Sequence, residues 1–158
     1  MIKIDADFVS KIVEKARKSE RKRMNYNFHK FPEDPINRMV HGMEPDTYVQ
    51  PHKHENPDKR EAFIILKGRV AVVEYSDEGK ISEIFILDSH TGNFGVEIPS
   101  RTWHSLVCLE TGSVIYEIKD GPYNPEDDKC FAPWAPKEGD TDAFKFNEKI
   151  LGTMNQKS

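Results

Sequence analysis

The sequence has few cysteines, no long hydrophobic run and no excess of basic charge. Its 158 residues include two cysteines, a number that predicts a reduced, cytoplasmic protein and excludes a disulfide-rich scaffold. The longest apolar run covers residues 62–66, too short to span a bilayer, and the first residues carry no signal-peptide stretch. The net charge is −4, with 23 basic and 27 acidic side chains, so we expect neither nucleic acid nor a membrane as a partner.

Proline is missing between Asp58 and Ile98, although the chain contains ten prolines. Strands can pair there without losing backbone donors. Short apolar or alternating segments, separated by turn residues such as Gly68, lie within and around this stretch. They cover residues 47–52, 61–67, 69–75, 83–88, 94–98, 104–109 and 113–119. Such a succession of strands without intervening helices predicts an all-β protein, either an antiparallel sandwich or a barrel.

A helix is predicted before the strands, from Ala6 to about Ser19, with Asp5 as its N-cap. Its apolar residues fall on one face at helical spacing, namely Phe8, Ile12, Val13 and Ala16. The segment 62–66 is apolar on both faces, so another sheet, this helix or a second subunit must cover its second face. From about residue 137 the chain looks like a partly ordered extension. The predicted division is an N-terminal helical extension, a β domain and a C-terminal extension, at residues 1–22, 23–136 and 137–158.

Six histidines are the least ordinary number in this small acidic protein, and two of them lie at strand spacing. In a strand, His52 and His54 point to the same face, with roughly 6.6–7 Å between their Cα atoms. Glu61 begins the next predicted strand, so the hairpin would bring its carboxylate beside the two imidazoles. His104, which follows a proline-bounded turn, adds a third imidazole. Three histidines and a carboxylate predict a site for one divalent transition metal (Zn, Fe, Mn, Ni or Co), with one or two positions open for water or substrate.

The spacing of these residues is similar to that of two known motifs. The pattern H-x-H-x6-E-x6-G over residues 52–68 resembles the first motif of the cupin superfamily, G-x5-H-x-H-x3,4-E-x6-G. The pattern P-x4-H over residues 99–104 resembles the core of the second, G-x5-P-x-G-x2-H-x3-N. Both matches imply a cupin metal site built from the three histidines and the glutamate.

The chain also departs from these motifs. The gap between His54 and Glu61 is longer than usual, and Glu55 is the competing ligand. In a strand Glu55 would face away from the site, so Glu61 is the predicted ligand. Arg101 and Cys108 stand where the second motif usually has glycine and asparagine. These changes leave the expected fold intact and weaken any direct analogy with the catalysis of other cupins.

From about Ser19 to Asp140 the sequence resembles the WbuC-like cupin-fold metalloproteins. The segments that carry the resemblance are Arg23–His29, Pro51–His54, Gly95–Pro99, Thr102–His104, Gly121–Tyr123 and Phe131–Pro136. The resemblance implies a double-stranded β-helix, or jelly roll, with a metal at its centre. The WbuC-like family is associated with bacterial O-antigen and surface-polysaccharide gene clusters. A homodimer is expected because exposed β edges in this fold need cover.

Polar residues elsewhere are candidates for contacts with a substrate. Asn25, Asn27 and His29 share one face of a predicted strand and are expected to bind a polar ligand. Arg38 and Arg101 are further candidates for holding an anionic group. The predicted catalytic residues are Glu117, Lys119 and Tyr123. Here Glu117 would act as a base or orient a ligand, and Lys119 would hold an anion. His41 is expected to be a packed or edge histidine, and His90 a solvent-exposed turn residue.

The expected function is metal-assisted chemistry on a small polar molecule, a sugar or sugar nucleotide in surface-polysaccharide biosynthesis. An isomerase or epimerase suits that context, with the metal polarising a carbonyl while a carboxylate or histidine moves a proton. An Fe-dependent oxygenase and a non-catalytic metal- or sugar-binding module are the alternatives, because one fold hosts many functions.

Overall fold

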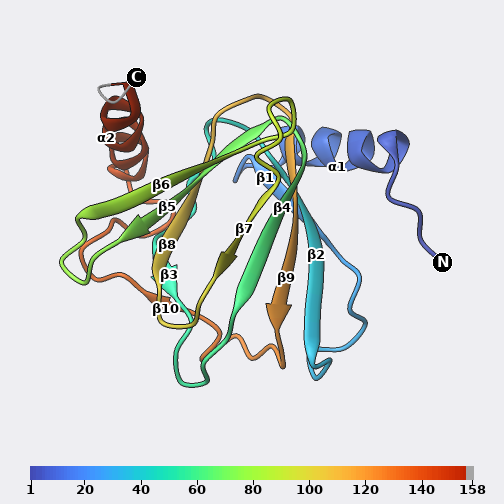
Figure 1. Ribbon diagram of the computed structural model, residues 1–158, viewed down its shortest axis with the longest axis horizontal. Coiled ribbons are helices and arrows are strands. Elements are labelled where there is room, and N and C mark those ends of the chain that lie inside the picture. The colour runs from blue at the N-terminus through green and yellow to red at the C-terminus, as the bar shows by residue number, and fades with distance from the viewer. Residues whose placement is uncertain (156–158) are drawn as a thin grey trace.

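The computed structural model describes residues 1–155, which form two five-stranded antiparallel sheets and two helices (Figure 1). The first sheet has the strand order β1-β2-β9-β4-β7. Its strands are β1 (Arg23–Asn27), β2 (Ile36–Met43), β4 (Glu61–Lys67), β7 (Gly95–Ile98) and β9 (Ser113–Asp120). The second sheet has the order β10-β3-β8-β5-β6. Its strands are β3 (His52–Lys53), β5 (Arg69–Tyr75), β6 (Ile81–Asp88), β8 (Trp103–Cys108) and β10 (Cys130–Phe131). The arrangement confirms the predicted jelly-roll barrel of the cupin type.

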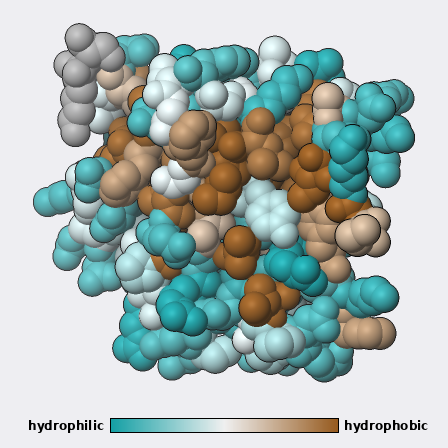
Figure 2. All heavy atoms as spheres, turned by 45° about the vertical axis from the view of Figure 1, so that its right-hand side comes forward, coloured by the Kyte–Doolittle hydropathy of each residue, from teal (hydrophilic) through white to brown (hydrophobic). Residues whose placement is uncertain are grey.

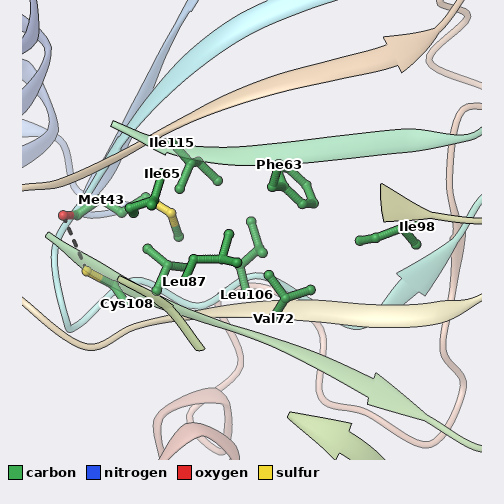
Figure 3. Close-up of a cluster of buried hydrophobic side chains, with 10 residues drawn as sticks. Met43, Phe63, Ile65, Val72, Leu87, Ile98, Leu106, Cys108 and Ile115 are labelled. Carbon is green, nitrogen blue, oxygen red and sulfur yellow. Dashed lines mark hydrogen bonds between the residues drawn. The ribbon is translucent and has the colours of Figure 1, made fainter. Parts of the chain in front are cut away.

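The inner faces of the two sheets enclose a hydrophobic core. Its buried members are Met43, Phe63, Ile65, Val70, Val72, Leu87, Ile98, Leu106, Cys108 and Ile115. Figure 3 shows these side chains directed toward one another from the two sheets, with the Cys108 thiol donating to the carbonyl of Met43 at 3.4 Å. Burial raises the pKa of Cys108 to about 11, so this cysteine is a packing residue in its protonated form.

Helix α1 (Ala6–Lys18) covers part of the outer face of the first sheet. The backbone amide of Phe8 donates to the Asp5 carboxylate at 3.0 Å, which confirms the predicted N-cap. Ile12 and Val13 pack with Val40 and Val114 of the sheet. The predicted apolar face of this helix therefore covers the outer face of the sheet at β1, β2 and β9, and not the segment 62–66 on β4.

Helix α2 (Ala143–Asn155) lies on the other side of the molecule from α1, where it packs against part of the second sheet (Figure 1). Ile150 packs, together with Phe146, in a cluster that includes Val73, Tyr75 and Trp103. The expectation of a partly ordered extension after residue 137 is therefore wrong for residues 143–155. The division of the chain at residues 22 and 136 stays a prediction. None of the helices within residues 1–155 is long and apolar enough to cross a membrane.

We expect Ile150→Ala to lower the free energy of unfolding by about 2–5 kcal/mol, because it leaves a cavity under α2. The Ile150 side chain is 2% exposed. The neighbouring Leu151 is 37% exposed, so Leu151→Ala is the matched control and should change stability by less than about 1 kcal/mol. Urea unfolding of both variants provides the measurement. Equal effects of the two substitutions would show that α2 does not pack on the sheet as described.

Residues 47–52 do not form the predicted strand, since only His52 and Lys53 pair as β3. Side chains from elsewhere bind this backbone in place of a neighbouring strand. Asn147 of α2 donates to the carbonyl of Thr47 at 2.9 Å, and Arg23 donates to that of Tyr48 at 2.7 Å. The segment is thus anchored by side chains from α2 and β1.

The outer face of the first sheet is only partly covered. Ile64, Leu66 and Ile118 alternate with inward-facing residues and are between 37% and 40% exposed. Figure 2, which brings the β2 and β9 side of the molecule forward, shows hydrophobic side chains gathered in a band across the middle. This surface lies beside α1 and outside the cavity described next.

Candidate metal centre

Four buried side chains converge between the sheets, as the sequence predicts. They are His52, His54, Glu61 and His104, and one possible ligand atom from each lies within 4.8 Å of all the others. His52 on β3 pairs directly with His104 on β8, and Glu61 opens β4 in the facing sheet. Each of the four residues is at most 4% exposed. The jelly roll thus brings together ligands that lie far apart in the sequence.

The Nε2 atoms of His54 and His104 and the Oε1 atom of Glu61 face one another without forming hydrogen bonds. Glu61 Oε1 lies 3.2 Å from His54 Nε2 and 2.6 Å from His104 Nε2. Although these atoms are close and buried, none of them makes a hydrogen bond of acceptable geometry with any residue in 1–155. Buried polar atoms are almost always paired, so three such atoms at one point indicate that another group belongs there. A cation bound by imidazole and carboxylate donors fits this arrangement.

The other ring nitrogen of each histidine is already engaged. His52 Nδ1 lies 2.9 Å from the carbonyl of Gln50, and His104 Nδ1 lies 2.9 Å from that of Thr102. His54 Nδ1 donates to the backbone carbonyl of Asp128. A carbonyl accepts but cannot donate, so each Nδ1 carries the proton and each Nε2 presents its lone pair to the cluster. This is the tautomer that a histidine requires to bind a metal through Nε2.

The surroundings favour a neutral His52 and an ionised Glu61. Burial, and after it the positive charge of Lys129, places the pKa of His52 well below its usual value. Burial alone would raise the pKa of Glu61, but His104 and His54 more than offset this effect and lower it. Burial also opposes protonation of His104, yet the Glu61 carboxylate raises the pKa of this residue. Glu61 is therefore ionised, and a metal would compete with the proton that His104 and Glu61 attract.

The cluster opens into a cavity of about 540 Å³. Six of the predicted substrate-binding and catalytic residues line this cavity: Asn25, Asn27, His29, Glu117, Lys119 and Tyr123. The Asn25 amide donates to Asn27 at 2.6 Å, so these two residues form one hydrogen-bonded surface. Their roles in binding and catalysis stay predictions, but the structure brings all six to the space beside the cluster.

Arg38 and Arg101 are not among the cavity-lining residues within 1–155. Arg38 is exposed on β2, whose cavity-facing residues include its neighbours Asn37 and Met39. Arg101 is exposed, and its guanidinium forms an ion pair with Asp58 at 2.8 Å. The structure does not bring these arginines to the cavity, and their role in substrate binding stays a prediction.

Sequence reasoning missed a buried charge network on one wall of the cavity. The Asp128 carboxylate accepts from Lys59 Nζ at 2.8 Å and from Lys119 Nζ at 2.6 Å. Lys59 also donates to the carbonyl of Pro122 at 2.7 Å. Because the Asp128 carbonyl accepts from His54, one residue binds both lysines and orients a metal ligand. Nothing in the sequence around Asp128 distinguishes it from an exposed acidic loop.

A second missed residue is His41, which lies in the cavity beside Glu117. Its Nε2 atom is 2.8 Å from Glu117 Oε2, and Lys119 Nζ is 4.0 Å from Glu117 Oε1. Burial alone would raise the pKa of Glu117, but His41 and Lys119 more than offset that effect, so the pKa lies below its usual value. Met39, His41 and Met43 occupy every second position of β2, and all three line the cavity. This spacing is the sequence signal that could have identified His41 as a cavity residue.

The two-sheet fold and its buried cluster of three histidines and one glutamate define a cupin-fold protein with a metal-type site. KdgF from a Halomonas species has this fold, with a TM-score of 0.51, 16% identity, and coverage of 66% of this chain and 83% of KdgF. The capsular polysaccharide assembling protein CapF of Staphylococcus aureus matches with a TM-score of 0.55, 19% identity, and coverage of 72% of this chain. This chain spans only 30% of CapF. At these identities the similarity shows the shared fold alone.

The chain belongs to the family described as "Domain of unknown function (DUF6016)", whose sequence pattern matches residues 4–87. The matched region contains α1 and three of the four clustered residues, His52, His54 and Glu61. No curated protein matches this chain in sequence.

Proposed function

We propose that this protein is a metal-dependent isomerase or epimerase that moves a proton on a sugar or sugar nucleotide. The observation that carries the proposal is the cavity, which joins a buried three-histidine, one-carboxylate cluster to a second, ionised carboxylate at Glu117. A metal site beside a positioned base is the combination that proton abstraction next to a carbonyl requires.

The residues that would hold the metal are His52, His54, Glu61 and His104. Zn, Fe, Mn and Ni are all compatible with this ligand set. A divalent metal bound there would act as a Lewis acid toward a carbonyl or hydroxyl oxygen of the substrate. Three histidines fixed by backbone carbonyls favour a rigid ligand set.

Glu117 is the proposed base. Its carboxylate faces the cavity and is ionised, so Oε1 or Oε2 can accept a proton from a bound sugar. His41 lies against Oε2 and stabilises the charged form. Lys119 is engaged by Asp128, so we assign it the role of positioning Glu117. Tyr123 is 42% exposed, and its ring lies 5.9 Å from Lys119 Nζ, where its hydroxyl could bind a sugar hydroxyl.

The biological context of the proposal is surface-polysaccharide biosynthesis. It is supported by the resemblance to WbuC-like cupins, and the description of CapF as a capsular polysaccharide assembling protein agrees with it. We also propose a homodimer, since a second copy could cover the exposed side chains of Ile64, Leu66 and Ile118. Light scattering of the purified protein measures that oligomeric state.

The test is solvent deuterium incorporation, followed by NMR, into a panel of free hexoses, hexuronates and nucleotide sugars with tag-free, metal-loaded protein. Glu117→Gln should lower the rate of incorporation by about 10²–10⁴-fold and leave the metal content unchanged. Glu126→Gln, which alters an exposed acidic residue, is the matched control and should retain the wild-type rate.

Three results would contradict the assignment. Unchanged incorporation in the Glu117→Gln protein would exclude Glu117 as the base. Ligand binding without incorporation into any compound of the panel would favour a non-catalytic binding module. Oxygen consumption by the iron-loaded protein, dependent on one of the sugars, would favour an oxygenase.

A further inference from the structure

We propose that Lys129 binds an anionic group of the ligand, a carboxylate or a phosphate, beside the metal centre. This proposal depends on the proposed function in one respect, that the cavity binds a small molecule. It adds that this molecule carries an oxyanion. Sequence reasoning assigned the anion-binding role to Lys119. The structure instead favours a different lysine, because the other cations of the cavity wall already have carboxylate partners.

The pairing of those cations leaves Lys129 as the exception. Lys119 is bound by Asp128 at 2.6 Å, and the same carboxylate binds Lys59 at 2.8 Å. At the cavity mouth, Arg21 and Arg23 both bind one carboxylate, that of Glu138, at 2.5 Å and 2.7 Å. For Lys129, no ion pair or hydrogen bond of its ammonium group is found within residues 1–155.

The fold places Lys129 next to the metal ligands. Phe131 of β10 pairs with His52 of β3, and Lys129, which directly precedes β10, lines the cavity together with Phe131. Asp128 in turn contacts His54 through its carbonyl. Lys129 remains accessible to solvent, yet enclosure by the surrounding protein lowers its pKa, as expected for an ammonium without a close counter-ion.

The charges of the cavity favour an oxyanion as the missing partner. Lys59 and Lys119 are balanced by Asp128 and Glu117, and Glu117 is also in contact with His41. Glu61 is the one carboxylate in the cluster, so it would offset only part of the charge of a divalent metal. A net positive charge would therefore remain between the metal position and Lys129, where a carboxylate or phosphate would be attracted from both sides.

The experiment measures the binding of inorganic phosphate and of glucuronate to tag-free, metal-loaded protein by thermal shift across a concentration series, with neutral glucose as the uncharged reference. Ligands that bind only the folded state raise the melting temperature by mass action. Lys129→Met and Lys129→Gln should weaken the binding of the preferred anion by about tenfold or more, and Lys129→Arg should largely retain it. Lys80→Met, at an exposed turn lysine of the second sheet, is the matched control.

Phosphate and glucuronate are separate arms, so a response to one identifies which oxyanion the site accepts. Equal binding by wild type and both neutral variants would overturn the proposal. So would the absence of any stabilisation of metal-loaded wild type by either anion at millimolar concentration. Metal content is measured on the same samples, and deuterium incorporation is a separate assay. Lys129-dependent anion binding without proton exchange would therefore support this inference while contradicting the proposed isomerase.

Discussion

The double variant His52→Ala, His104→Ala is expected to leave purification without stoichiometric metal, whereas the tag-free wild type carries one ion per chain. The substitutions remove two facing ligands that pair across β3 and β8. We expect the metal affinity to fall by more than the roughly 100-fold that loss of an outer hydrogen-bond partner causes. Elemental analysis of both proteins gives the measurement.

The control for this variant is His90→Ala, because the His90 side chain is 67% exposed in a turn. That substitution should leave metal content unchanged. Full occupancy in the double variant would show that the ion binds elsewhere. Circular dichroism of the metal-free double variant tests whether it is folded. A folded spectrum distinguishes the loss of metal from unfolding.

The second large effect is expected at Asp128, although no sequence motif marks this residue. Asp128→Asn leaves Lys59 and Lys119 buried without their shared carboxylate, and both side chains are at most 4% exposed. Removing one partner of a buried ion pair costs about 3–5 kcal/mol of folding free energy. Urea unfolding of the variant measures this loss. Asp127→Asn, which alters the exposed neighbour, should change stability by less than about 1 kcal/mol.

The contribution of Asp128 should also depend on pH. Burial alone would raise the pKa of this carboxyl, but Lys119 and Lys59 more than offset the effect and lower it. A carboxyl with a lowered folded-state pKa stabilises the fold above its unfolded pKa and loses that effect as pH falls through the folded value. The stability gap between wild type and Asp128→Asn should thus be constant from about pH 5 to 8 and shrink below about pH 4. A gap that widened on acidification would contradict this assignment.

Strands with strong local signals could be predicted from the sequence. β4 and β5 occur at the predicted bounds, 61–67 and 69–75, because two apolar segments flank Gly68 at a tight turn. Gly68 has a φ of +76°, a conformation that glycine adopts without strain. Helix α2 was missed because the chain before it is rich in proline and acidic residues. The spacing of Phe146, Ile150 and Met154 is nevertheless helical, and these residues pack on the second sheet.

The candidate site likewise contains one part that could be predicted from the sequence and one part that could not. His52 and His54 lie two residues apart, and although β3 ends at Lys53, extended-chain spacing is sufficient to predict that both side chains point to the same side. The neighbours of Asp128 follow from the order of the sheets, which brings the loop before β10 against β9 and the chain preceding β4. Local patterns carry no record of such distant partners. The pair His52 and His54 could therefore be predicted from its spacing, and Glu61 and His104 from the similarity to the cupin motifs, whereas the charges that surround the cluster could not.

The pairing of β3 has a consequence for the order of events during synthesis. This two-residue strand, which carries His52, pairs only with β8 and β10 among the described strands. Both partners lie far downstream, so a ribosome-bound chain that ends before β8 has no strand partner for His52. Contacts between residues so distant in sequence form slowly. Metal capture should thus be a late step, coupled to completion of the second sheet, and partly made chains should not hold the ion.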